Sequence, residues 1–159
     1  MAKTHESTER RSLSFSSMDD ILADAESLAA SGGIRTTGGW RPGQNLQHVA
    51  RFIRCSVEGF DGLFPWPVRA IGRLIRKRVV RMSLKPGFKV PGRFDALRPD
   101  DEATVAQGLD ELRRVVALAK ERGMAQASPI LGELSHDEWE QLHCRHAEMH
   151  FSFLHPARD

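Results

Sequence analysis

Three histidines near the C-terminus, His143, His146 and His150, are the residues of this sequence best placed to do chemistry. Their i, i+3, i+7 spacing places the three imidazoles within roughly 60° of one another on an α-helix. The apolar residues of the segment share that side, which we therefore expect to be buried. They are Trp139, Leu142, Phe153 and Leu154, and the opposite side, expected to be solvated, carries Gln141, Arg145, Glu148 and Ser152. Buried imidazoles each need a polar partner, and one divalent metal ion can serve several of them.

His146 and His150 have the i, i+4 spacing that brings two ring nitrogens to one ion. The pair differs from the zinc protease motif, which has Glu directly after the first histidine, because Ala147 occupies that position here. Glu148 is about 200° around the helix and should point away from the ion. The alternative interpretation is a set of core histidines that are hydrogen-bonded to the backbone or to each other.

A second predicted helix, over residues 42–61, carries His48. Its solvated face is marked by Gln47, Arg51, Arg54 and Glu58, and its buried face by Leu46, Val49, Ile53, Val57 and Phe60. His48 lies at the boundary of the two faces, close in angle to Gln44 and Cys55. Four-helix bundles build metal sites from side chains on facing helices, so His48 could join the histidines of the last helix.

Three segments of the sequence resemble an uncharacterised branch of the DinB-like superfamily. They are Gly-Gly-Trp followed by Gly-Gln-Asn-Leu-Gln-His at 38–48, Gly-Glu-Leu-Ser-x-x-Glu-Trp at 132–139, and Leu-His-x-x-His-x-x-x-His-x-Ser-Phe-Leu at 142–154. Ser-Phe-Ser-Ser at 14–17 and Lys-Pro-Gly-Phe-Lys at 85–89 also fit, so the resemblance spans roughly residues 12–156. It implies an all-α fold: a four-helix bundle of the DinB type, here with an extra amphipathic helix or loop between the second and third bundle helices.

The same resemblance implies a divalent metal ion bound by His48, His146 and His150. His143 is an additional histidine, so the choice between it and His146 stays open, and we expect His143, Gln44 and Cys55 in the surroundings of the ion. All-imidazole sites suit zinc or nickel, and also iron or copper. The catalytic residues are not identifiable from the sequence, because neither Glu133 nor Asp137 is placed as an evident general base.

Characterised relatives in the superfamily include thiol-dependent transferases and isomerases. The resemblance therefore implies a metal-dependent enzyme, a thiol-dependent transferase or a hydrolase, acting on a small molecule that is anionic or a thiol. The competing hypothesis is a non-catalytic metal-binding or stress-response bundle protein. Activity against a panel of thiols and electrophiles would separate the two.

The bulk composition fits one globular domain. The chain has 159 residues, 28% of them charged, and a net charge of +2, which argues against general affinity for nucleic acids. We expect a disordered tail over residues 1–12 and a single domain over 13–157. Two cysteines, Cys55 and Cys144, provide no disulfide framework, and Cys55 is expected to be a small buried apolar residue rather than a soft ligand or redox thiol. No stretch is long and apolar enough to cross a membrane, and we expect a cytoplasmic protein.

Capping and breaking residues predict further helices over residues 18–31, 67–83 and 100–122, and a last helix that begins after Ser135. No strand pattern persists anywhere. The segment 69–93 holds nine Lys or Arg residues and no acid. Together with an apolar stripe of Val68, Ile71, Ile75, Val79 and Met82, these charges predict an amphipathic basic helix. The charges could form a solvated face of an accessory helix, a positive rim that attracts an anionic substrate to the metal, or a nucleic-acid or membrane surface, and we predict the rim. An apolar cluster of Phe60, Leu63, Phe64 and Trp66 suggests a homodimer.

Overall fold

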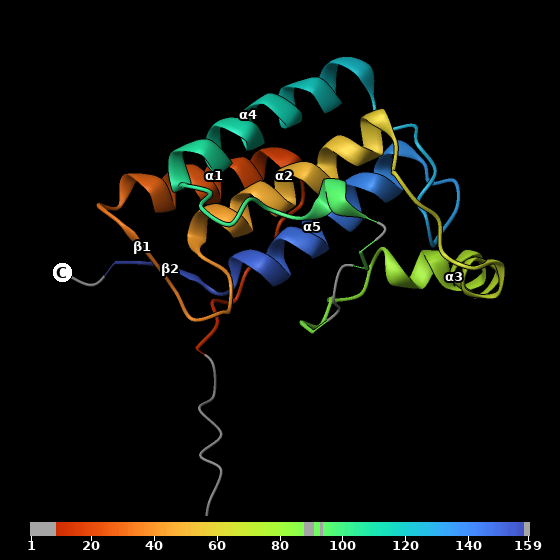
Figure 1. Ribbon diagram of the computed structural model, residues 1–159, viewed down its shortest axis with the longest axis horizontal. Coiled ribbons are helices and arrows are strands. Elements are labelled where there is room, and N and C mark those ends of the chain that lie inside the picture. The colour runs from red at the N-terminus through yellow and green to blue at the C-terminus, as the bar shows by residue number, and fades with distance from the viewer. Residues whose placement is uncertain (1–8, 88–90, 93, 158–159) are drawn as a thin grey trace, which may run out of the picture.

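The computed structural model of the chain describes residues 9–87, 91–92 and 94–157, and it is mainly helical (Figure 1). Its α-helices are α1 (Met18–Ala30), α2 (Pro42–Glu58), α3 (Trp66–Val79), α4 (Val105–Arg122) and α5 (His136–Phe151). A short 3-10 helix, η1 (Asp95–Leu97), precedes α4, and two three-residue strands, β1 (Ile34–Thr36) and β2 (Leu154–Pro156), complete the elements. None of the described helices is long and apolar enough to cross a membrane.

Local sequence determines where the helices begin. Ser17, Thr104 and Ser135 each cap the first turn of a helix through a capping box, with Asp20, Gln107 and Glu138 as the reciprocal partners. Pro42 occupies the first turn of α2, where no backbone N–H is needed. The prediction that the fourth helix begins at residue 100 was wrong by one turn, because Thr104 is the capping residue and the preceding residues form a turn.

Four of the helices, α1, α2, α4 and α5, lie alongside one another around a common apolar core (Figure 1). α2 contacts α4 most extensively and also α5, while α1 contacts both α4 and α5. The crossing of α2 and α4 is close because Gly43 and Gly108 meet there: a Cβ atom added at Gly108 would lie 2.7 Å from the Gly43 carbonyl oxygen. This crossing fixes the helix that carries His48.

A small antiparallel sheet links the segment that follows α1 to the segment that follows α5, at one end of the helical core (Figure 1). β1 pairs with β2 so that Arg35 lies opposite His155, and the backbone N–H of Thr37 donates to the Phe153 carbonyl. The sequence did not predict these strands, because three residues are too few to show an alternating pattern. The last helix therefore ends at Phe151, and Phe153 and Leu154 are not on its buried face as expected, although Leu154 is fully buried in β2.

Two faces predicted to be solvated are partly covered, although Gln141 on α5 and Glu58 on α2 are exposed as predicted. On α5, Glu148 accepts a hydrogen bond from the Phe15 backbone N–H (2.6 Å) and Arg145 donates to the Phe15 carbonyl (2.6 Å), so the segment before α1 lies over them. Ser152 is buried as well. On α2, Gln47 is buried beneath the loop that precedes α4. Helical periodicity identifies the polar face but cannot show that an irregular segment covers it.

The expected disordered tail spans residues 1–12, of which residues 1–8 lie outside the described part of the chain. Residues 9–12 contact the helical core. The Arg11 backbone N–H donates to the Ser152 carbonyl (2.7 Å), and the Arg11 guanidinium forms a bidentate pair with Asp24 at 2.7 and 2.8 Å.

The helix α3 stands apart from the other four helices (Figure 1). The amphipathic basic helix was predicted, but most of its apolar stripe is exposed: Val68, Ile71, Ile75 and Met82 are each at least 42% accessible. Gly72 is the buried residue of α3, and a Cβ atom added there would lie 2.4 Å from the Ile130 carbonyl oxygen. Arg76 donates to the Glu133 carbonyl (2.9 Å), so α3 is held to the turn that precedes α5.

Candidate metal centre

Three histidines from two helices converge at one point of the structure. His48 comes from α2, and His146 and His150 come from successive turns of α5. One ring nitrogen from each lies within 4.8 Å of the others, and the Nε2 atoms of His48 and His146 are 3.2 Å apart. We refer to these three residues as the histidine triad. It is the set of ligands that the resemblance implied, and its geometry could hold a metal ion.

The orientation of His48 is determined by the loop that precedes α4. The His48 Nδ1–H donates to the Leu97 carbonyl (2.7 Å), which leaves the lone pair of Nε2 directed at the other two histidines. A backbone carbonyl that accepts from the second ring nitrogen is the usual way in which a metal-binding histidine is oriented.

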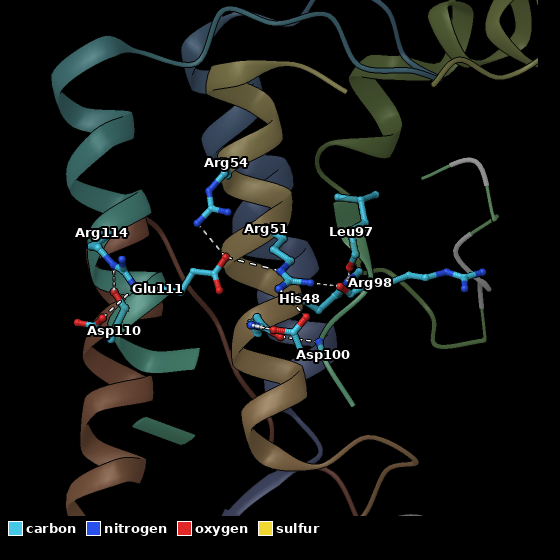
Figure 2. A network of polar contacts seen from close by, with 10 residues as sticks. His48, Arg51, Arg54, Leu97, Arg98, Asp100, Asp110, Glu111 and Arg114 are labelled. Atoms are coloured by element: carbon cyan, nitrogen blue, oxygen red, sulfur yellow. Dashed lines mark hydrogen bonds and ion pairs between the residues drawn. The ribbon is translucent and has the colours of Figure 1, made fainter. Parts of the chain in front are cut away.

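A polar network holds this loop against α2 (Figure 2). Asp100 accepts from Gln47 Nε2 (2.9 Å) and pairs with Arg51 (3.0 Å), and its backbone N–H donates to Gln47 Oε1 (2.7 Å). Arg51 also donates to the Arg98 carbonyl. Two residues of α2, Gln47 and Arg51, which are one turn apart, therefore fix the backbone that orients His48.

Aromatic rings enclose the triad. Trp40 stacks on His150, with ring centroids 5.5 Å apart, and its edge faces His48 at 4.8 Å. Phe52 lies against His146 at 4.5 Å. Neither Trp40 nor Phe52 was predicted as a site residue, although the Gly-Gly-Trp motif directly before α2 was a signal for Trp40.

Burial keeps the triad in the neutral form that binds metals. It lowers the pKa of His48, and it lowers the pKa of His146 and His150 well below the ordinary value. Repulsion between the imidazolium forms adds to the effect at His146 and His150. Because a metal ligand must offer a lone pair, nothing has to be deprotonated at neutral pH before an ion binds.

The donor set fits a divalent transition metal. Three neutral imidazoles are ligands for zinc, nickel, copper or iron, and three protein ligands leave coordination positions open, as in catalytic zinc sites. Among the described residues, the Nδ1 atom of His146 is buried without a hydrogen-bond partner, and its Nε2 atom is the ring nitrogen that faces His48. In the described part of the chain, no carboxylate or thiol joins the group.

His143 lies outside the triad. Its ring is buried between Trp139 and Phe52, and its Nε2 is 2.9 Å from Ser56 Oγ. Since that hydroxyl donates to the Ile53 carbonyl, it must accept from the His143 Nε2–H. Burial lowers the pKa of His143 to about 3, so it is neutral. It supports the α2–α5 contact beside the triad.

The other residues expected around the ion have different positions. Gln44 caps α2 through the Arg41 backbone N–H (3.0 Å) and lines the cavity described below. Cys55 is a buried free thiol packed with Phe94 and Leu97. Burial raises its pKa to about 11, which agrees with the predicted role as a small apolar residue.

A cavity of about 740 Å³ opens beside the triad, between α3, α5 and the loops on either side of η1. All three triad histidines line it, together with Trp40, Gln44, Phe52 and residues of α3. A bound ion would therefore face space that a small molecule can enter, since small-molecule sites typically measure roughly 300–1,000 Å³.

The basic segment contributes less to this rim than predicted. Arg76 is used to hold α3 against the turn before α5, and Gly132 lies against the side chain of Arg73. Lys85 is the basic residue of the segment that lines the cavity, and Arg98 adds a second cation from outside it. Lys89 and Arg93 lie outside the described residues. Glu133 and Asp137 are exposed near the N-terminus of α5, whereas His146 and His150 are in its last two turns.

The family model described as "Protein of unknown function (DUF1569)" matches residues 7–157. The chain belongs to this family. The matched range includes every element of the structure and all three histidines of the triad, so the candidate metal centre lies within the part of the chain that matches the family. No curated protein and no solved structure matches the chain.

Proposed function

We propose that this DUF1569 protein is a metal-dependent enzyme whose divalent ion is bound by His48, His146 and His150. The observation that carries the proposal is the convergence of three neutral imidazoles, within 4.8 Å of one another, on the wall of a cavity of about 740 Å³. A site that served only structure would have no need of such a cavity. The contacts among α1, α2, α4 and α5 support a bundle of the DinB type, with α3 as the extra amphipathic helix.

The residues around the triad have separate roles in this proposal. Leu97 orients His48 through its carbonyl, and Trp40 covers His150 and restricts the approach of water. Asp101 is a carboxylate that lines the same cavity, but it is exposed at the cavity's edge, so we assign no general base. A divalent ion bound there would supply Lewis acidity toward a substrate oxygen or sulfur. Transfer to a thiol and hydrolysis both use that chemistry.

The test is an activity screen of the protein loaded with zinc, nickel, iron or copper. Substrates would be low-molecular-weight thiols paired with electrophiles, and activated esters and amides. We expect turnover of one of these substrate classes. His150→Ala should lower the turnover rate at least a hundredfold. His136→Ala, which removes an exposed histidine of the same helix, should leave the rate unchanged. A loaded protein without turnover in any class would favour the non-catalytic metal-binding or stress-response protein.

A further inference from the structure

The walls of the cavity beside the triad are apolar over most of their extent. Its lining on the side of the helices includes Phe52, Leu142 and Met149, and on the side of α3 it includes Ile75 and Val79. Aromatic and aliphatic residues of the loops complete it: Phe60, Phe64, Leu84, Phe94, Leu97, Ile130 and Leu131. A polar molecule would lose hydrogen bonds with water here without replacement, whereas a hydrocarbon or aromatic body would gain from burial.

The open edge of the cavity is charged. Lining residues that are also exposed must lie at this edge, and they are Ile75, Lys85, Arg98 and Asp101. Two cations and one carboxylate therefore lie at this edge. Arg98 is more than half exposed, lies 3.5 Å from Asp95, and extends away from the network of Arg51 and Asp100 (Figure 2).

We propose that this cavity binds a small organic anion with an extended apolar body. The charged group lies at the edge with Lys85 and Arg98, and the apolar body lies between α3 and α5 and extends toward the triad. If the bound anion is also the substrate, the proposal rests on the proposed function. The binding of the anion requires only the cavity. The exposed apolar residue Ile75 is explained at the same time, because it forms the entrance for the apolar body.

Calorimetry on protein kept metal-free by a chelator tests the binding, because a carboxylate probe then has no ion to bind. The probes are decanoate, decan-1-ol and butyrate. We expect one decanoate per chain, at least tenfold weaker binding of butyrate, which lacks the apolar body, and weaker binding of decan-1-ol, which lacks the charge. Butyrate or decan-1-ol binding as tightly as decanoate would overturn the proposal, as would no binding of decanoate.

Two neighbouring residues of α3 distinguish the cavity from the surface of that helix. Ile75 lines the cavity, whereas Leu74 is 86% exposed and does not. Ile75→Trp should weaken decanoate binding at least tenfold and Leu74→Trp less than twofold. Equal effects would mean binding to the outside of α3 and would contradict the proposal. If Ile75→Trp does not fold by circular dichroism, Ile75→Asp, with Leu74→Asp as its control, makes the same comparison.

The charged edge is tested with Arg98→Gln. This change should weaken decanoate binding about three- to tenfold and leave decan-1-ol binding unchanged, and an equal effect on both probes would overturn the placement of the anion. Metal titration of the wild-type protein separates this proposal from the metal site, because decanoate should bind to the metal-free protein whether or not the histidine triad takes up an ion. If the protein binds decanoate but takes up no metal ion, the proposed function is wrong and the anion-binding cavity stands.

Discussion

Each histidine of the triad has its own surroundings, with His48 buried and His146 and His150 half-buried. His48 donates to a backbone carbonyl, His150 lies under Trp40, and His146 faces His48. Helical spacing predicted that His146 and His150 share one face of a helix. His48 lies on another helix and was added by the resemblance to the DinB-like superfamily. The sequence could not predict the Leu97 carbonyl, because backbone groups of an irregular loop have no sequence signature, nor could it rank His143 below His146 from angle alone.

At the same scale, burial predicts that both cysteines are unreactive in the folded protein. It raises the pKa of Cys55 to about 11 and that of Cys144 to about 12, so the thiolate is scarce at pH 8. We expect neither thiol to react with Ellman's reagent within minutes in the native protein and both to react in denaturant. Rapid labelling of native Cys55, lost in Cys55→Ser, would instead indicate a functional thiol close to the triad.

His143 predicts that the metal-free protein loses stability in acid. Its pKa is about 3 in the folded protein and about 6.5 in the unfolded chain, so between these values only the unfolded chain binds the proton. His143 therefore does not change the free energy of unfolding above pH 6.5, and it lowers that free energy as the pH falls below 6.5. From pH 7 to pH 4.5, the free energy of unfolding measured by urea titration should fall in both proteins, and the fall should be roughly 2–3 kcal/mol smaller in His143→Gln than in the wild type. An identical loss in both proteins would mean that His143 is protonated in the native state.

At the scale of elements, the close crossing of α2 and α4 positions the triad. A Cβ atom added at Gly108 would lie 2.7 Å from the Gly43 carbonyl oxygen and 2.8 Å from Leu46 Cβ, and backbone cannot move aside cheaply. Gly108→Ala should therefore lower the free energy of unfolding by about 1–3 kcal/mol in urea titrations, and Ala106→Ser on the exposed side of α4 should change it little. A Gly108→Ala protein as stable as the wild type would show that the two helices do not approach so closely.

Helix positions were predictable where capping residues and periodicity act locally. Ser17, Pro42 and Ser135 begin their helices as the sequence indicates. The end of α5 and the pairing of β1 with β2 were missed, because both depend on contacts between distant segments, such as Thr37 with Phe153. Periodicity also predicted the apolar stripe of α3 correctly. It could not predict that most of the stripe is exposed to solvent and that Ile75 lines a cavity.

At the scale of the whole molecule, the exposed apolar surface is concentrated in one region. Among the described residues, every large hydrophobic side chain that is exposed lies between Leu63 and Met82, and Leu74 and Trp66 are the most accessible at 86% and 77%. Of the cluster suggested for dimerisation, Phe60 and Phe64 are partly buried, and Leu63 and Trp66 remain exposed.

This distribution predicts a two-fold dimer through α3. Like charges on the two copies of the helix should make association stronger at high salt. Light scattering at high micromolar concentration should give twice the chain mass in 0.5 M salt, and Leu74→Glu should return the protein to a monomer. A monomer at every salt concentration would exclude the dimer.

The central claim is that His48, His146 and His150 hold one metal ion, and metal titration of the chelated protein tests it most directly. We predict one zinc or nickel ion per chain. Binding should be weakened at least a hundredfold by His48→Ala, His146→Ala or His150→Ala, and should survive both His143→Ala and the control His136→Ala. Loss of the ion in His143→Ala with retention in His150→Ala, or unchanged binding in all three triad variants, would contradict the assignment.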